Sequence, residues 1–267
     1  MKKNNILVTI LITNFNKQNY IEDTINSCIK QSYKNIEIII IDNCSTDNSV
    51  KLISKYKNIK IIMNKIRKKS SALNQIRSIE IGALKSRGKL ICLLDGDDMF
   101  KKDKIKKIVK SFNKHIKICA ICDVPIIYNG HTRNDEFFYN KKRFYKSNIW
   151  PNTFPTSSIS LKKEYLLDCI DLFKKNEYPL LEIDFRICCL LPLYQNSFLI
   201  LNQNLTFYRQ VNDGIMSKYK KFRKSWWLKR NEAFNFFKFI KKSHKNEFNY
   251  GLDYMVTKII VFFFQKY

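Results

Sequence analysis

The sequence lacks a hydrophobic run long enough to cross a bilayer. Its longest apolar runs, residues 36–41 and 259–264, fall far short of the roughly 18–20 residues that a transmembrane helix needs. Residues 2–12 resemble a short signal peptide, with two lysines before an apolar stretch, but no small-residue cleavage site follows them. We therefore predict a first buried strand at residues 6–12 and expect the chain to stay in the cytoplasm.

Glycine and proline are also scarce, with 6 and 5 residues among 267, which excludes a collagen-like or low-complexity linker protein. Hydrophobic residues make up 45% of the chain and aromatic residues 14%, so a fully disordered chain is excluded as well. The length fits one large domain, or one domain with an appendage. The 8 cysteines include one Cys-x-x-Cys pair, Cys119 and Cys122, without a second pair at metal-binding spacing. We expect reduced thiols that serve as packing residues.

Acidic residues are few: 23 Asp and Glu face 49 Lys and Arg, and the formal net charge is +26. A charge of this sign attracts nucleotides, phospholipids and nucleic acid. The richness in Lys, Ile and Asn is also typical of AT-rich coding, so the charge alone does not identify a partner. The 3 histidines are isolated in the sequence, and we expect them at the surface.

Short apolar segments alternate with helical patterns through the first half of the chain. We predict strands at residues 6–12, 36–41, 59–63, 90–94 and 118–122, which are rich in Ile and Val and apolar on both faces, as buried parallel strands are. Helical patterns lie between them, and Thr46 or Asp47 is expected to cap a helix that ends near Tyr56. The β-α-β-α-β series predicts an open α/β sheet.

The pattern changes after about Asp123. Residues 124–155 are predicted to form irregular loops rich in aromatic side chains, residues 181–191 a short apolar helix, and residues 198–208 two short strands. From Tyr219 onward the chain is basic and aromatic. The spacing predicts one or two amphipathic helices, with Trp226, Phe234 and Phe237 packed inward and lysines outward.

Polar clusters follow three of the predicted strands directly: residues 13–16, 42–47 and 95–98. Ligands of open α/β sheets bind at the carboxyl ends of the strands, so these clusters are candidate site residues. Asp95 and Asp97 are two residues apart on a tight turn and can both face one hard cation, because Mg²⁺ and Mn²⁺ prefer oxygen ligands. A turn that caps the next helix is the structural alternative. Asp42 suits a hydrogen bond to a ribose or a base edge.

Three blocks, VTILITNFN, IEIIIIDNCSTDNS and GKLICLLDGDDMF, occur in that order. With them the sequence resembles the inverting, family 2-type glycosyltransferases with the GT-A fold, specifically over residues 5–123 and more weakly to about residue 215. The resemblance implies an α/β fold with a mixed, mainly parallel sheet flanked by helices. It divides the chain into a catalytic domain at 1–215, with a nucleotide-sugar half (1–123) and an acceptor half (124–215), and a basic aromatic helical tail at 216–267.

The resemblance also implies a chemistry: a nucleotide-sugar donor, preferably a UDP-sugar, bound with Mn²⁺ or Mg²⁺. The nucleotide-sugar-binding residues that it implies are Thr13, Asn14, Phe15, Asn16, Asp42, Asp95 and Asp97. Asp95 and Asp97 are implied to face the metal and the diphosphate, with Asp97 the preferred direct ligand. Asp184 fits the position of the general base that accepts a proton from the acceptor hydroxyl, with Glu182 as the alternate. Salt bridging of Asp184 to Arg186 or a nearby Lys is the structural alternative.

Some positions depart from the family pattern. Thr13 stands where Pro is usual, and Val211 stands where a His that helps to bind metal or phosphate is usual; Arg209, Asn212 or Asp213 are candidate replacements for this His. A weakened, transferase-like binding protein is therefore one alternative. A sugar-nucleotide nucleotidyltransferase is disfavoured because residues 13–16 contain no Gly.

The partners expected from the sequence are a nucleotide-sugar donor and a glycan or lipid-linked acceptor used in surface-polysaccharide synthesis. The basic aromatic tail predicts either peripheral attachment to an anionic membrane surface or ordinary helices that close the core. A basic nucleic-acid-binding module is a further alternative, but no zinc-finger, RRM or KH signature is present, and we expect no specific nucleic-acid partner.

Overall fold

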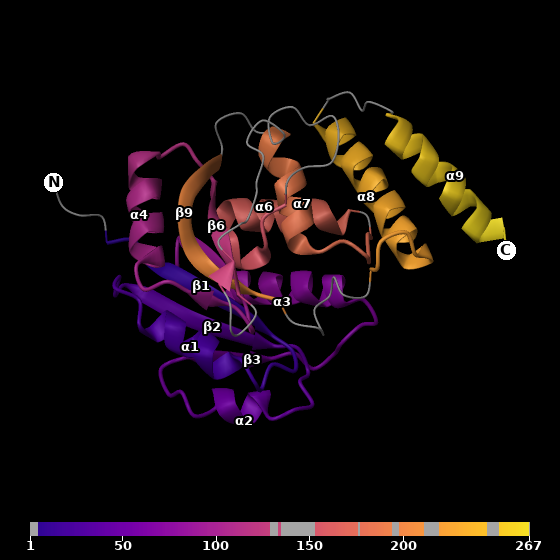
Figure 1. The fold of residues 1–267 in the computed structure, drawn as a ribbon. Helices are drawn as coiled ribbons and strands as arrows, with labels where there is room; N and C mark the ends of the chain where they lie inside the picture. Colours follow the sequence, from indigo (N-terminus) through magenta and orange to yellow (C-terminus); the bar gives the residue numbers. More distant parts are fainter. Residues whose placement is uncertain are drawn as a thin grey trace.

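The computed structural model describes residues 5–128, 133–134, 153–175, 177–193, 198–210, 219–244 and 251–266. These residues form a nine-stranded sheet with helices on both faces (Figure 1). The strands are β1 (Val8–Asn14), β2 (Ile36–Asp42), β3 (Lys60–Met63), β4 (Leu90–Asp95), β5 (Met99–Phe100), β6 (Ala120–Tyr128), β7 (Arg133–Asn134), β8 (Ile159–Lys162) and β9 (Phe198–Arg209). The helices are α1 (Ile21–Ile29), α2 (Ser49–Ile53), α3 (Ser71–Lys85), α4 (Lys104–Lys114), α6 (Lys163–Lys174), α7 (Ile183–Leu190), α8 (Lys224–Ser243) and α9 (Leu252–Lys266), with short 3-10 turns at Thr156–Ser158 and Leu191–Leu193.

The N-terminal half is a parallel βαβ arrangement, as predicted. The sheet order is β3-β2-β1-β4-β8-β6-β9-β5, with β7 paired to β6, and β1 pairs in parallel with both β2 and β4. All five predicted strands are present; four lie within two residues of their expected bounds, and the fifth, β6, ends six residues later than predicted. The expected cap is wrong: α2 has Asn48 at its N-cap, and Asp47 instead accepts a hydrogen bond from the backbone N–H of Ser49 at 2.9 Å.

The second half of the sheet was predicted less well. β6 continues to Tyr128, so the irregular region does not begin at residue 124, while most of residues 129–152 lies outside the described part. The two short strands expected at 198–208 are one strand, β9, which pairs in parallel with β6 along its length. The register shifts beside Val124, where the polar residues 202–203 project to solvent. A bulge of this kind bends a strand without ending it, which explains why the sequence pattern is interrupted there.

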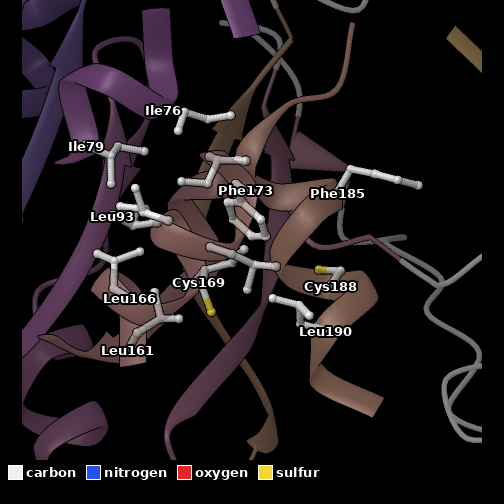
Figure 2. Close-up of a cluster of buried hydrophobic side chains, with 14 of the residues drawn as sticks. Ile76, Ile79, Leu93, Leu161, Leu166, Cys169, Phe173, Phe185, Cys188 and Leu190 are labelled. Atoms are coloured by element: carbon white, nitrogen blue, oxygen red, sulfur yellow. The ribbon is translucent and has the colours of Figure 1, made fainter. Parts of the chain in front are cut away.

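Alternate side chains of the central strands fill two separate cores. In β4, Cys92 and Leu94 belong to a cluster with α1 and α4, whereas Ile91 and Leu93 belong to a cluster with α3, α6, α7 and α8. Figure 2 shows part of the second cluster, where Leu93 lies near Ile79 of α3 and the side chains of α6 and α7. Six of the eight cysteines lie in these cores: Cys28, Cys92, Cys122, Cys169, Cys188 and Cys189. Burial on both faces of β4 explains its continuous apolar sequence.

The two C-terminal helices differ in how they pack. Ala233, Phe236, Phe237 and Ile240 of α8 are part of the second core, and Phe234 is buried as predicted. Trp226 is not packed inward: it is partly exposed and lies against Phe222 and Trp227. α9 packs against α8 and is the outermost helix (Figure 1). Among the described residues, no helix is both long and apolar enough to span a bilayer.

A buried ion pair connects the two halves of the sheet. Lys104, at the start of α4, and Asp123, in β6, are both completely buried, and their side chains lie 2.6 Å apart. The Lys104 ammonium also donates to the carbonyl of Ser157 at 2.7 Å and to Thr206 Oγ1 at 2.6 Å. Thr206 in turn donates to Asp123 at 2.7 Å. The network therefore joins α4, β6, β9 and the turn at Thr156–Ser158 directly behind the carboxyl end of β4.

Replacing Lys104 by Met is expected to lower the free energy of unfolding by about 3–5 kcal/mol, because Asp123 then stays buried without its cation. Urea denaturation followed by circular dichroism measures the change. Lys107→Met is the matched control, since Lys107 is exposed on the same helix and its loss is expected to have an effect near zero. Equal stability of the two variants would show that the buried pair is not needed.

Candidate active site

Asn14 and Asp42 meet at the carboxyl ends of β1 and β2. They are register partners in the parallel pair, and Asn14 Nδ2 donates to Asp42 Oδ2 at 2.7 Å. Ser45 donates to the same carboxylate through its backbone N–H at 2.9 Å and its hydroxyl at 2.6 Å. Asn16 and Cys44 adopt positive φ values of 51° and 60°, which turn both chain segments sharply at the strand ends. Asp42 is therefore held rigidly at the edge where ligands of such sheets bind.

Phe15, the residue after Asn14 at the end of β1, has a partly exposed side chain. The guanidinium of Arg67, in the segment between β3 and α3, lies 3.3 Å from the centroid of the Phe15 ring. In this structure the cation therefore covers one face of the Phe15 ring. Arg67 had no predicted role, because nothing in its local sequence indicates that it reaches the end of β1.

Asp95 is the last residue of β4 and is held by two side chains. Thr13 Oγ1 and Gln75 Nε2 each donate to Asp95 Oδ1 at 2.9 Å, and the backbone N–H of Asp95 donates to Ser157 Oγ at 3.0 Å. Burial, together with the negative charge of Asp97, raises the pKa of Asp95 to about 6. Gln75, from α3, is a site residue that the sequence analysis missed.

Asp97 and Asp98 complete an acidic turn. Asp97 Oδ2 lies 2.9 Å from the ammonium of Lys17, whereas Asp98 accepts hydrogen bonds from Ser157 Oγ at 2.5 Å and the backbone N–H of Arg209 at 2.7 Å. Burial and the charges of Asp97 and Asp95 raise the pKa of Asp98 well above its usual range. Asp98 therefore supports the turn from behind, while Asp97 faces a cation.

Gly96 allows this turn to lie directly against β1. A Cβ atom at Gly96 would lie 2.8 Å from Asn14 Oδ1 and 3.2 Å from the carbonyl oxygen of Thr13. Both distances are shorter than ordinary van der Waals contacts, so a larger residue would push the acidic turn away from Asn14. The glycine between the two acids is thus required by this close approach.

Asp184 lies in the first turn of α7 and is half-buried. Burial and the nearby charge of Glu182 raise the pKa of Asp184 to about 7, and Asp95 contributes in the same direction. Glu182 itself is paired with Lys229 of α8, whose ammonium lies 2.5 Å and 2.7 Å from its two carboxylate oxygens. The side chain of Arg186 donates to the carbonyls of Leu181 and Tyr178. These contacts do not support a salt bridge from Asp184 to Arg186, one form of the structural alternative; for the other form, a nearby Lys, Lys229 is the candidate, since its positive charge lowers the Asp184 pKa.

Tyr208, in β9, is within electrostatic range of both Asp184 and the acidic turn. The negative charges of Asp98, Asp184, Asp95 and Asp97 add to burial in raising the pKa of the Tyr208 phenol above its usual range. The next residue, Arg209, donates from Nε to the carbonyl of Asp97 at 2.9 Å. The family-motif position Val211 and its candidate replacements Asn212 and Asp213 lie outside the described residues.

The residues at the ends of β1 and β4 fit a divalent cation, although the carboxylates supply only part of its ligands. Within the described ranges, no group of three or more His, Cys, Asp or Glu side chains is arranged to hold a metal ion. The negative charge of Asp97 helps to raise the pKa of Asp95, and a cation bound beside the turn would relieve this repulsion. Two hard oxygen donors suit Mg²⁺ or Mn²⁺ when substrate phosphates provide further ligands.

The comparison with family models gives a match that extends beyond the segment with these motifs. Residues 9–167 match the model described as glycosyl transferase family 2, which is more than half of the chain. This protein belongs to glycosyl transferase family 2. The match begins within β1 and continues into α6, so it includes the turns at Asn14, Asp42 and Asp97.

Several relatives of this family 2 glycosyltransferase are named in bacteria. TuaG of Bacillus subtilis, whose name places it in teichuronic acid biosynthesis as a glycosyltransferase, is 24% identical over 245 residues, which cover 87% of this chain and 91% of that protein. An uncharacterized glycosyltransferase of Haemophilus influenzae is 39% identical over 119 residues, covering 43% of this chain and 35% of that protein.

Solved structures confirm the predicted GT-A fold of this family 2 glycosyltransferase. Staphylococcus aureus TarS in complex with UDP-GlcNAc superposes with a TM-score of 0.63 at 15% identity, covering 96% of this chain and 70% of that one. The mannosyltransferase PcManGT from Pyrobaculum calidifontis, in complex with GDP-Man and Mn²⁺, gives a TM-score of 0.57 at 12% identity, with 96% and 69% covered.

Proposed function

We propose that this glycosyltransferase is an inverting, metal-dependent enzyme that transfers a hexose from a UDP-sugar to a hydroxyl of a glycan or lipid-linked acceptor. The observation that carries the proposal is Asp184, a carboxylate in the first turn of α7 that lies within electrostatic range of Asp95 at the end of β4 and whose pKa burial raises to about 7. A carboxylate with a pKa raised toward neutral pH is a better acceptor for the proton of a hydroxyl than an ordinary carboxylate. Teichuronic acid biosynthesis, in the name of TuaG, supports a role in surface-polysaccharide synthesis.

In this proposal the nucleoside binds at the ends of β1 and β2. Phe15 offers a ring face to the base, and Asp42 offers carboxylate oxygens to the ribose or the base edge. Asn14 Oδ1 and Gln75 Oε1 are buried acceptors without a hydrogen-bond partner in the described protein, so they suit donor groups of a bound ligand. UDP is favoured because TarS is named with UDP-GlcNAc, although PcManGT is named with GDP-Man.

Asp97 and Asp95 would hold the Mn²⁺ or Mg²⁺ ion. When bound, such an ion stabilises the negative charge of the departing diphosphate as a Lewis acid. Lys17, 2.9 Å from Asp97, and Arg209, bonded to the carbonyl of Asp97, add positive charge beside the same turn. Asp98 and Ser157 fix the turn in place through their hydrogen bond.

The acceptor hydroxyl is deprotonated by Asp184. Its oxygen attacks the anomeric carbon from the face opposite the diphosphate, the bond from that carbon to the phosphate oxygen breaks, and the proton stays on the Asp184 carboxylate. A single displacement inverts the anomeric configuration. Glu182, the alternate base in our sequence analysis, is less suited because the ammonium of Lys229 contacts both of its oxygens. We further propose that the enzyme attaches peripherally to an anionic membrane, where lipid-linked acceptors are found.

A thermal-shift panel tests the donor. Purified full-length protein is melted with UDP-, GDP-, CMP- and dTDP-sugars, each with and without Mn²⁺. We expect stabilisation by the UDP-sugars that needs Mn²⁺, because a ligand that binds only the folded state raises the melting temperature. Stabilisation by GDP-sugars alone would replace UDP in the proposal. A well-folded protein that responds to none of the donors would contradict the transferase assignment and support the weakened binding protein.

A further inference from the structure

The outer face of α9 carries a continuous apolar stripe. Six large side chains are between 45% and 81% exposed: Leu252, Met255, Val256, Ile259, Phe262 and Phe263. Their spacing of one, three and four positions places them on one face of the helix, over a length of about 17 Å. On the opposite face, Val261 and Thr257 are buried, and Tyr254 contacts Phe234 of α8 with ring centroids 5.4 Å apart. The stripe therefore points away from the protein.

The charged side chains of α9 that the structure describes contact α8 and lie off the stripe. Asp253 pairs with Arg230, and Lys258 donates to Asn235 Oδ1 at 2.7 Å. The stripe is thus apolar along its length, which is unusual for a surface helix unless something covers it.

A basic aromatic collar, which we define as residues 220–227, lies next to the end of this stripe. Phe222 is 64% exposed, and its ring packs against Trp226, which packs against Trp227, with centroids 5.5 Å and 4.7 Å apart. The Lys224 ammonium lies 5.7 Å from the ring of Phe264, so the start of α8 adjoins the end of α9, as Figure 1 also shows. The collar contains four exposed cations and no acid: Lys220, Lys221, Arg223 and Lys224.

The charge of the collar decides between the occupants that an apolar helix face can have. A second copy of this chain carries the same net charge of +26, so two copies repel each other as they approach. An anionic bilayer instead complements the lysines, accepts Trp and Phe rings at the headgroup level, and buries the apolar stripe to a shallow depth.

We propose that the α9 stripe and the basic aromatic collar form one docking face that lies flat on an anionic phospholipid surface. The face continues through α8 to the candidate base. Trp226 contacts the guanidinium of Arg230 at 5.0 Å, and Lys229, beside it on the helix, pairs with Glu182, two residues from Asp184. Docking would hold the acceptor side of the site close to the membrane; this last consequence alone rests on the proposed function, since it requires a lipid-linked acceptor.

Co-sedimentation of the full chain with vesicles tests the docking face. The vesicles are phosphatidylcholine alone, or phosphatidylcholine with phosphatidylglycerol. We expect binding only to the anionic vesicles, and a drop in the partition coefficient of at least about tenfold for Phe262→Glu/Phe263→Glu, which puts two charges into the stripe. Ile116→Glu is the control for an exposed apolar residue elsewhere, since Ile116 is 74% exposed, and it should bind like wild type.

Two charge-matched triple variants distinguish binding through the collar from the general attraction of a basic protein to an anionic surface. Lys220→Gln/Lys221→Gln/Lys224→Gln removes three collar cations, and Lys106→Gln/Lys107→Gln/Lys110→Gln removes three exposed cations of α4. Only the collar variant should lose about tenfold or more in binding. Equal losses in both, or wild-type protein that does not sediment with anionic vesicles, would overturn the proposal. So would a wild-type dimer that Phe262→Glu/Phe263→Glu dissociates, because the second copy would then be the occupant.

The experiments distinguish a failure of the docking proposal from a failure of the proposed function. Each docking variant is melted with and without the donor that stabilises wild type. Retained donor stabilisation with lost vesicle binding supports the docking face. Vesicle binding that follows the expected pattern in a protein that binds no donor would support the docking face and contradict only the proposed sugar transfer.

Discussion

Asp184→Asn is expected to lower the rate of sugar transfer by about 10²–10⁴-fold, because Asn cannot accept the proton of the acceptor hydroxyl. Donor binding should be unchanged, since Asp184 lies in α7 and the nucleoside residues lie at the ends of β1 and β2. The measurement is initial-rate kinetics with a saturating donor, together with donor-induced thermal stabilisation. Asp168→Asn, an exposed acid on α6, is the matched control and should keep wild-type activity.

The pH dependence of kcat in the wild-type enzyme is a second test of the role of Asp184. The active form of a general base is deprotonated, so kcat should rise with pH and level off above about 7, the pKa to which Asp184 is raised. Glu182→Gln should move this rise to lower pH, because the negative charge of Glu182 raises the Asp184 pKa, whereas the positive charge of Lys229, which remains in the variant, lowers it. A Glu182→Gln enzyme as inactive as Asp184→Asn would contradict the choice of Asp184 as the base.

Linkage gives a stability test of the same pKa that does not depend on activity. A carboxyl group with a raised pKa in the folded protein contributes stability below its unfolded pKa, near 4, and this contribution is lost as pH rises through about 7. Wild type should therefore lose more stability than Asp184→Asn between pH 5 and pH 8. The comparison uses urea denaturation of both proteins at each pH.

The sequence predicts the first half of this fold well for a physical reason. Strands such as β4 are buried on both faces by separate cores, so each is a short, continuous apolar run that ends where polar residues begin. The parallel register then places Asn14 opposite Asp42, and Thr13 opposite Asp95. Local sequence is sufficient for β1, β2 and β4 because these strands are mostly buried and carry the same signal.

The sequence is less informative where contacts depend on distant residues. β9 is one strand because it pairs with β6 on both sides of a register shift. Its polar residues 202–203 lie at this shift, and in the sequence alone they indicate a break between two strands. Gln75 and Ser157 reach Asp95 from α3 and from the turn at Thr156–Ser158. Long-range packing brings them there, and nothing in the sequence around Gln75 distinguishes it from a surface residue of its helix.

Asp97→Asn is expected to remove metal-dependent donor binding. Asp97 is the carboxylate of the acidic turn that faces a cation, as its 2.9 Å contact with Lys17 indicates, and Asn is a neutral, weaker ligand for a hard cation. We expect donor affinity in Mn²⁺ to fall by at least about 100-fold. This is the upper end of the loss that follows removal of a residue that only orients a metal ligand, and Asp97 is proposed as a ligand itself. The amplitude of the free Mn²⁺ signal in electron paramagnetic resonance, with and without UDP-sugar, measures metal binding directly.

Two controls make the test of Asp97 specific. Asp103→Asn removes an exposed acid that follows the same turn and bonds to Ser32, and it should bind Mn²⁺ like wild type. Lys17→Met removes the cation that neighbours Asp97 and should keep or strengthen Mn²⁺ binding, because the ammonium competes for the same carboxylate oxygen. If Asp97→Asn kept full Mn²⁺ binding in the presence of donor, Asp97 would not be the metal ligand. A different outcome is that wild type binds the donor equally well with and without Mn²⁺, and that Lys17→Met abolishes this binding. Lys17 would then be the cation of the site, and the enzyme would stabilise the leaving diphosphate with Lys17 in place of a metal ion.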